Sequence, residues 1–216
     1  MPVQITPEQI AQLAPSARSS YRVAFRAGQP VFDRFGISAA PLRVAHFMAQ
    51  VLHESAALTV QFENLNYSAE RLSEVWPRFF WPTGPLDPAA YAHKPEKLAE
   101  KVYGGRMGNV TSDDGYKYRG RGLLQLTGKD NYAEATSVLR GIFPDVPDFT
   151  ADPDAVIGTD WCLKVAAVKW FTIGCNERAD RDAINEITRA INGGLIGIAG
   201  RMEWARRTKF IWCRAD

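Results

Sequence analysis

Two carboxylic acids, Glu54 and Glu63, are the candidate catalytic side chains of this sequence. Glu54 ends the stretch "AHFMAQVLHE", in which apolar residues recur at helical spacing. At the C-terminal end of such a helix, desolvation and the negative end of the helix dipole both favour the protonated carboxyl. A carboxyl that is protonated near neutral pH can act as a general acid. The alternative is a glutamate that simply reaches solvent.

Glu63 lies nine residues further along, in "VQFENLNY". On one continuous helix this spacing would place the two carboxyls on opposite faces, so they can face each other only if the chain turns after Ala57. Two carboxylates across a cleft, far enough apart to hold a water molecule, are what inverting glycoside hydrolysis needs. Glu70 and Glu74, on the next expected helix, are rivals of Glu63 for the second position.

A metal site is the other chemistry that this region could suggest. The pair His53-Glu54 resembles the start of a zinc-protease motif, but that motif needs a second histidine three residues after the glutamate, where Ala57 stands. His46 and His53 share a helix face without a clear third ligand. We therefore expect no metal and no other cofactor.

A glycine-rich stretch, "YKYRGRGLLQLTGKDNY" (116–132), allows several interpretations. It fails as a phosphate-binding loop, because Asp130 follows Lys129 where that motif requires a hydroxyl residue. It also differs from an arginine–glycine RNA-binding tail, which would repeat its units and lack an apolar core. With a net charge of only +2, we expect no nucleic-acid partner. The remaining interpretation is a packed segment whose glycines allow close backbone approach and which presents Gln125 and Thr127 on one side.

The elements that must position these side chains are expected to be helices. Strand-like alternation is scarce, and Tyr118 and Leu123–Leu126 are too short to support a sheet. A capping box between Thr6 and Gln9 predicts the first helix start, and Pro95 is expected to interrupt a later helix. The sequence thus predicts one mostly α domain. Its expected helices cover about 41–55, 68–76, 89–102, 131–139, 159–171, 181–191 and 199–213.

Composition places the chain among ordinary globular proteins. Its 216 residues are 46% hydrophobic and 23% charged, enough to bury a sizeable core. The three cysteines match no metal motif and are expected to be small buried hydrophobes. The start "MPVQITPEQI" lacks the features of a signal peptide, and no segment reaches about 18 uninterrupted apolar residues. We therefore expect synthesis in the cytoplasm and no membrane span.

Taken together, the motifs "HES", "ENLNYS", "YRGRGLLQLTGKDNY" and "ITRAINGG" resemble glycoside hydrolase family 19. The resemblance runs from about Pro41 to Arg207 and is to the compact bacteriophage endolysins and related bacterial enzymes rather than to plant chitinases. It implies a mainly α, lysozyme-like fold with two lobes flanking a saccharide-binding cleft. It also implies a single catalytic domain over 1–216, with roughly 60–112 forming a smaller lobe and no separate cell-wall-binding domain.

Residue by residue, the resemblance assigns a role to each motif. Glu54 matches the general acid, Glu63 matches the base of the endolysin-type members, and Thr127 matches the hydroxyl that holds the attacking water. Plant members place the base on a loop that this sequence lacks, so Glu63 rests on the endolysin pattern. Ile196 stands where many relatives carry a polar residue. The positions that match sugar contacts or their support are Gln125, Asn131, Asn192, Lys164, Arg201 and His53.

The activity that the resemblance implies is hydrolysis, with inversion, of β-1,4 bonds between N-acetylated amino sugars. We expect an endolysin that cleaves bacterial peptidoglycan and lyses the host, reaching the periplasm from the cytoplasm after holin-type release. Three alternatives remain: a chitinase acting on chitin, a bacterial peptidoglycan-degrading effector with the same chemistry, and a catalytically silent wall-binding module. We expect a monomer.

The last expected helix carries an unusual number of basic residues beside aromatic ones. It could make weak contact with an outer membrane or lipopolysaccharide. The favoured alternative is a closing helix with its apolar face in the core and a solvated basic face. The basic residues are Arg201, Arg206, Arg207, Lys209 and Arg214.

Overall fold

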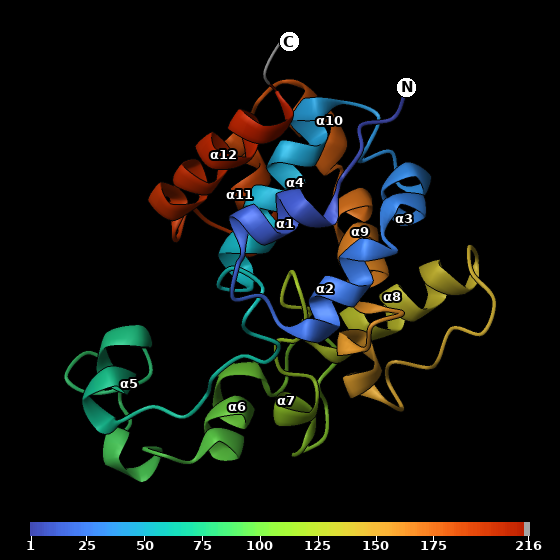
Figure 1. Ribbon diagram of the computed structural model, residues 1–216. Coiled ribbons are helices and arrows are strands. Elements are labelled where there is room, and N and C mark those ends of the chain that lie inside the picture. Colours follow the sequence, from blue (N-terminus) through green and yellow to red (C-terminus); the bar gives the residue numbers. More distant parts are fainter. Residues whose placement is uncertain (214–216) are drawn as a thin grey trace.

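Helices and connecting loops make up residues 1–213, the part of the chain that the computed structural model describes (Figure 1). Within these residues, β pairing is limited to isolated bridges, such as the one between Phe62 and Arg121. The expectation of a mainly α chain is therefore confirmed. The helices are α1 (Pro7–Leu13), α2 (Ser19–Arg26), α3 (Gln29–Arg34), α4 (Pro41–Glu54), α5 (Ala69–Val75), α6 (Pro95–Tyr103), α7 (Asp114–Lys117), α8 (Lys129–Arg140), α9 (Cys162–Thr172), α10 (Cys175–Asp180), α11 (Ile184–Asn192) and α12 (Ile198–Trp212), with 3-10 turns η1 (Pro88–Ala90) and η2 (Pro153–Ile157).

The helix boundaries follow local sequence signals in most places. Thr6 and Gln9 form the expected capping box at the start of α1. Pro95 was expected to interrupt a helix, and this was wrong: it is the first residue of α6. Proline is tolerated there because the first turn of a helix has unpaired N–H groups in any case. The short helices α2, α3, α7 and α10 were not expected, since four to eight residues give too little periodicity to read.

Two hydrophobic cores organise the chain. The larger one joins helices from both ends of the sequence, and in it Phe47 of α4 packs edge-on against Trp170 of α9. Cys162 and Cys175 are buried in the same core as free thiols. The buried residues of the smaller core all lie within residues 60–112, which we call the small lobe; the rest is the large lobe, whose Tyr116 packs against them. The buried members of the smaller core are Leu65, Leu72, Phe80, Leu98, Ala99 and Val102.

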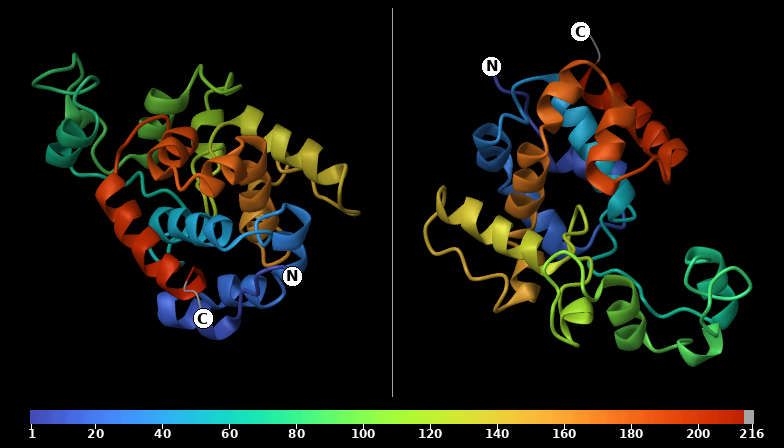
Figure 2. Two further views of the ribbon diagram at one scale, coloured as in Figure 1. Left: turned by 90° about the horizontal axis from the view of Figure 1, so that it is seen from above. Right: turned by 180° about the vertical axis from the view of Figure 1, so that it is seen from behind.

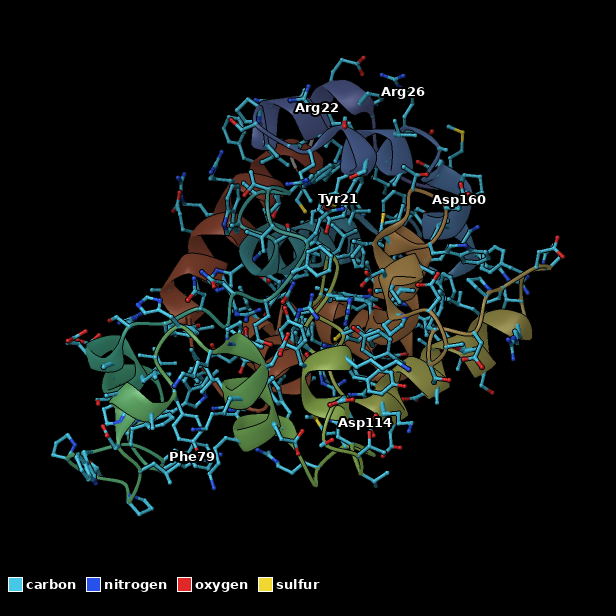
Figure 3. All side chains as sticks on the ribbon, turned by 90° about the horizontal axis from the view of Figure 1, so that it is seen from below. Tyr21, Arg22, Arg26, Phe79, Asp114 and Asp160 are labelled. Carbon is cyan, nitrogen blue, oxygen red and sulfur yellow. The ribbon has the colours of Figure 1, made fainter. Side chains whose placement is uncertain are left out.

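The small lobe projects from the large lobe in all the ribbon views (Figures 1 and 2). Its helices α5 and α6 lie to one side of the body formed by α1–α4 and α8–α12. The side chain of Phe79, labelled in Figure 3, lies in this projecting part, whereas Tyr21 lies in the large lobe. The two lobes are joined by the chain that leaves α4 and by the segment that follows α6.

The C-terminal helix α12 packs along α4 in the large lobe, where the hydroxyl of Thr208 donates to the carbonyl of Ala45 at 2.8 Å. Its basic side chains are engaged in different ways. Arg201 is buried, and the guanidinium of Arg207 stacks on Trp204. These contacts favour the closing-helix interpretation. Arg206 pairs with Glu203 and Lys209 pairs with Asp182, while Arg214 lies outside the described residues.

No helix in residues 1–213 combines the length and the apolar character needed to cross a membrane.

Candidate active site

Glu54 is the last residue of α4, as expected, and lies beside Arg201, which comes from the C-terminal helix α12. Arg201 of α12 is only 2% exposed, and its guanidinium donates to the carboxylate of Glu54. The same guanidinium donates to the side-chain oxygen of Gln50, one helical turn before Glu54. The buried guanidinium of Arg201 therefore holds the carboxyl of Glu54 from the side of the core, a contact that could not be predicted from the sequence.

Immediately after α4 the chain reverses through a left-handed turn. Ala56, Ala57 and Leu58 have φ angles of 47°, 55° and 64°, a region that costs roughly 1–2 kcal/mol per residue for side chains other than glycine. The buried hydroxyl of Ser55 compensates in part, because it accepts from the amide of Leu58 at 2.9 Å. The predicted turn after Ala57 is thus present and begins one residue earlier. It brings Glu63 back toward the end of α4.

Glu63 is held in extended backbone against Gly120. The amide of Glu63 donates to the carbonyl of Gly120 at 2.9 Å, and the amide of Gly120 donates to the carboxylate at 3.2 Å. The hydroxyl of Tyr103 donates to the other carboxylate oxygen at 2.5 Å. Burial raises the pKa of Glu63, and these two donors and the nearby Arg119 only partly offset that effect.

The glycine-rich stretch is a tight hairpin between Arg121 and Leu126, whose backbones exchange hydrogen bonds of 3.0 and 2.8 Å. Its arginines make structural contacts: Arg121 is buried and pairs with Asp154 at 2.8 Å, and Arg119 stacks on Tyr116. Gln125 sits at the end of the hairpin loop with a φ of 50°, which points the next residues toward Glu63.

Gly120 is the point where the two segments approach most closely. A Cβ atom at this position would lie 2.7 Å from the Oε1 atom of Gln125 and 3.2 Å from the hydroxyl of Thr127. It would also lie 3.2 Å from the Cβ atom of Glu63. Only glycine fits here without displacing a side chain, so the absence of a side chain at Gly120 brings a carboxyl, an amide and a hydroxyl into one place.

These segments surround one cleft of about 650 Å³. The carboxyls of Glu54 and Glu63 both line it, although they come from opposite sides of the left-handed turn. Asn131 enters from the first turn of α8, where its amide donates to the carbonyl of Thr127 at 2.6 Å. Asn192, the last residue of α11, also lines the cleft. The expected residues found in the lining are Glu54, Glu63, Gln125, Thr127, Asn131 and Asn192.

Other expected residues are not part of that lining. The ammonium of Lys164 lies over the rings of Trp161 and Phe143, at 4.3 and 4.8 Å from the ring centres. His53 packs against Gly197 and Gly200 at the start of α12, next to the acid but turned from the cleft lining.

The rivals of Glu63 also lie elsewhere. Glu74 pairs with Arg71 on the exposed face of α5, and Glu70 is exposed in the first turn of the same helix. Ile196 stands where many relatives carry a polar residue. Its side chain is 81% exposed. Its carbonyl accepts from the amide of Asn192 at 3.1 Å, so the backbone supplies a partner to this asparagine.

Several residues of the cleft were not among the predicted site residues, among them Tyr103, Arg106 and Lys169. Lys169 donates to the carbonyl of Leu124 at 2.8 Å, and burial lowers the pKa of its ammonium. Arg106 belongs to the irregular segment after α6, and long segments without regular structure in a compact domain are often functional. For Lys169 the sequence gives a weaker indication. It is a charged residue in an otherwise apolar helix, but the same is true of Lys164.

The segment that carries Arg106 is anchored by Asp114, labelled in Figure 3. Its carboxylate accepts from the amides of Val110 and Thr111 at 2.9 and 3.1 Å and pairs with Lys129 at 3.5 Å. Although burial alone would raise it, these donors lower the pKa of Asp114 to about 2. The wall of the cleft beside Tyr103 is therefore fixed by an ionised carboxylate.

Comparison with known proteins agrees with this arrangement. No protein-family model matches the sequence. A protein of Haemophilus influenzae, named a glycosyl hydrolase family 19 domain-containing protein, is 40% identical over 168 residues, which cover 76% of this chain and 78% of that protein. The chain belongs to glycoside hydrolase family 19. The resemblance stated from the motifs is thereby confirmed, as is the class of enzyme, a glycosidase.

Solved structures support the fold of this family 19 glycosidase. Chitinase C of Streptomyces griseus superposes with a TM-score of 0.59 at 18% identity, covering 98% of this chain and 93% of that one. A bacterial family 19 chitinase superposes with a TM-score of 0.56 at 22% identity, covering 94% of each chain. The mainly α fold expected from the motifs is therefore confirmed, and these two chitinases share it.

The two carboxyls of the glycosidase lie in contrasting surroundings. A guanidinium and, further away, the ammonium of Lys169 act on Glu54. Glu63 instead accepts hydrogen bonds from two neutral donors, the hydroxyl of Tyr103 and the amide of Gly120, with Arg119 nearby. A pair of carboxyls in one cleft with unlike environments is the arrangement that separates acid and base roles.

Proposed function

We propose that this glycosidase hydrolyses β-1,4 bonds between the N-acetylated amino sugars of bacterial peptidoglycan, with inversion at the anomeric carbon, and that it acts as an endolysin. The observation that carries the proposal is the cleft in which Glu54, Glu63 and Thr127 meet. Two carboxyls and a water-holding hydroxyl are sufficient for direct displacement by water.

In the proposed reaction, Glu54 protonates the glycosidic oxygen while the bond from that oxygen to the anomeric carbon breaks. A water molecule on the opposite face of the sugar bonds to the anomeric carbon. Its oxygen is held by the hydroxyl of Thr127, and its proton passes to Glu63. The hydroxyl of Thr127 donates to the carbonyl of Gln125 at 3.0 Å, which leaves its oxygen lone pairs to accept from this water.

Charge in the cleft favours peptidoglycan over chitin. Arg106 and Lys169 line the cleft, and within residues 1–213 neither forms an ion pair with a carboxylate. Chitin is uncharged, whereas the peptides attached to peptidoglycan carry carboxylates. Positive charge in a cleft raises the local concentration of an anionic substrate. We therefore place peptidoglycan first and chitin second, the latter because fold neighbours carry the name chitinase.

Release of reducing ends from purified murein sacculi and from colloidal chitin tests this order. We expect faster release from sacculi, and faster release from chitin would reverse it. Proton NMR of the first products tests the stereochemistry, since inversion of a β bond yields the α anomer. The murein fragments also reveal which of the two alternating bonds is cut.

The roles of the carboxyls are tested with Glu54→Gln. Removing a positioned general acid costs roughly 10²–10⁴-fold in rate, so we expect this variant to keep the fold and to lose lysis of chloroform-permeabilised Gram-negative cells. Glu74→Gln is the matched control, because Glu74 is an exposed glutamate outside the cleft. Near-wild-type lysis by Glu54→Gln would refute the assignment of Glu54.

A further inference from the structure

A column of polar side chains runs along one face of α4 beneath the active site. His46, Gln50 and Glu54 follow one another at intervals of four residues, which is one helical turn. His46 and Gln50 are completely buried, with no exposed surface, in a helix whose other buried residues are apolar apart from this pair. Buried polar groups of this kind are retained where their hydrogen bonds are satisfied, so their partners are informative.

The two ends of the column have clear partners. At the outer end, the Nε2 atom of His46 lies 2.6 Å from the carboxylate of Asp182, which also binds the ammonium of Lys209. At the inner end, Arg201 donates to the side-chain oxygen of Gln50 and to the carboxylate of Glu54. The general acid is thus connected to Gln50 through one guanidinium.

The middle of the column contains two buried atoms without a partner. Within residues 1–213, the Nδ1 atom of His46 and the Nε2 atom of Gln50 make no hydrogen bond to protein. Their chemistry is complementary. Because the oxygen of Gln50 accepts from Arg201, its remaining end is the amide donor. Because the Nε2 atom of His46 faces a carboxylate, that nitrogen carries the proton, and Nδ1 is a bare acceptor.

We propose that His46 is a positioning residue for the general acid, acting through a hydrogen bond from the Gln50 amide to His46 Nδ1, either directly or through one buried water. This proposal rests on the proposed role of Glu54. In this arrangement neutral His46 fixes which end of Gln50 faces Arg201. Gln50 then holds the guanidinium in the place from which it orients the carboxyl of Glu54.

Protonation of His46 would reverse this arrangement. A proton on Nδ1 would face the amide donor of Gln50, so the amide of Gln50 would have to turn over and present its NH₂ group to Arg201, which is also a donor. The charged groups that act on His46 are Asp182, from the turn between α10 and α11, and Lys209, from α12. Burial lowers the pKa of His46 despite Asp182, which keeps the ring neutral near pH 7.

The first test needs no substrate. The chain has three histidines, so ¹⁵N NMR of the imidazoles, assigned with single substitutions, reports the tautomer and the titration of each. We expect His46 to carry its proton on Nε2 and to stay neutral at pH 7. A proton on Nδ1, or a charged ring at pH 7, would overturn the proposal, whatever polymer the enzyme cleaves.

The second test uses two substitutions on whichever polymer the wild-type enzyme hydrolyses. His46→Phe fills the space without an acceptor, and we expect kcat to fall roughly tenfold with KM nearly unchanged, as for a misplaced catalytic group. His46→Asn offers an oxygen near the former Nδ1 position and cannot be protonated. We expect it to restore most of kcat, and its activity relative to wild type to rise as the pH falls through the NMR titration of His46.

The control is His93→Asn, an exposed histidine of the small lobe that bonds to Asn66. Equal losses of kcat and of melting temperature in both His46 variants would indicate a packing role only and would overturn the proposal. So would an unchanged kcat in a folded His46→Phe enzyme. If wild-type enzyme cleaves neither polymer, the proposed function fails, and the tautomer measurement still decides the His46–Gln50 bond.

Discussion

Tyr103→Phe is the substitution that most directly separates the roles of the two carboxyls. The hydroxyl of Tyr103 donates to Glu63 at 2.5 Å, and the amide of Gly120 is the second donor, at 3.2 Å. Both donors stabilise the ionised carboxylate against burial, which raises the pKa of Glu63. Removing the shorter bond leaves the ring in place and the carboxylate with one protein donor fewer.

The size of the effect follows from that one bond. A hydrogen bond to a charged group contributes about 1.5–3 kcal/mol, and one pKa unit corresponds to about 1.4 kcal/mol. Because the cleft is open to water that can partly replace the hydroxyl, we take the lower end of that range. The pKa of Glu63 in Tyr103→Phe should therefore rise by about one unit above its value in the wild type.

The direction of the change in activity depends on the role of Glu63. A general base must be ionised, so a higher pKa moves the acid limb of kcat/KM to higher pH by about one unit, while activity on the alkaline plateau changes little. If Glu63 were the acid, it would have to be protonated. The alkaline limb would then move upward instead, and activity at high pH would increase.

The assay is the pH dependence of kcat/KM for sugar release between about pH 4 and 9, with the fold checked by circular dichroism. The control is Tyr67→Phe: burial and, to a lesser degree, the nearby charge of Glu63 raise the pKa of Tyr67, and in the described structure its hydroxyl donates no hydrogen bond to Glu63. A shift of the alkaline limb, or an equal shift in both variants, would refute the assignment of Glu63 as the base.

Two further predictions concern the walls of the cleft. Gly120→Ala should reduce kcat at least tenfold, because the new Cβ atom would displace the side chain of Gln125 and press on Glu63 and Thr127, the groups proposed to hold the attacking water. Gly141→Ala, whose Cβ would meet nothing closer than 3.5 Å, should not, and equal kcat values for the two would contradict the geometry. Lys169→Ala should raise KM for murein sacculi severalfold while Lys164→Ala leaves it unchanged; the opposite ranking would restore the sequence-based choice of Lys164.

The sequence predicted the strongly periodic parts of the fold well. Helix α4 was expected over 41–55 and α12 over 199–213, and both are found within a residue of those bounds. Their apolar faces are long enough for the periodicity to decide. The prediction that Pro95 interrupts a helix was wrong because proline can either interrupt a helix or begin one. Only the surrounding structure decides between the two.

Six of the predicted site residues line the cleft, but the charges that surround its two carboxyls could not be predicted from the sequence. Motifs pointed to both carboxyls and to Thr127, since these residues stand within stretches of recognisable pattern. Nothing local indicates that Arg201, far along the chain, would contact Glu54. On α9, Lys164 and Lys169 are five residues apart, about 140° around the helix. Lys164 therefore lies over aromatic rings, whereas Lys169 reaches the cleft. Because both stand among apolar residues in the sequence, the pattern could not show which of the two lines the cleft.

The contrast between the carboxyls therefore arises from tertiary structure and not from the helix end alone. The sequence-based argument for a protonated Glu54 used burial and the helix dipole, whereas in the fold α12 adds the guanidinium of Arg201 to that position. In the proposed role of Glu54 as general acid, substrate binding must weaken this contact or displace the guanidinium. Gln50 accepts from the same guanidinium, so the proposed column of His46, Gln50 and Glu54 along α4 bears directly on where Arg201 is held.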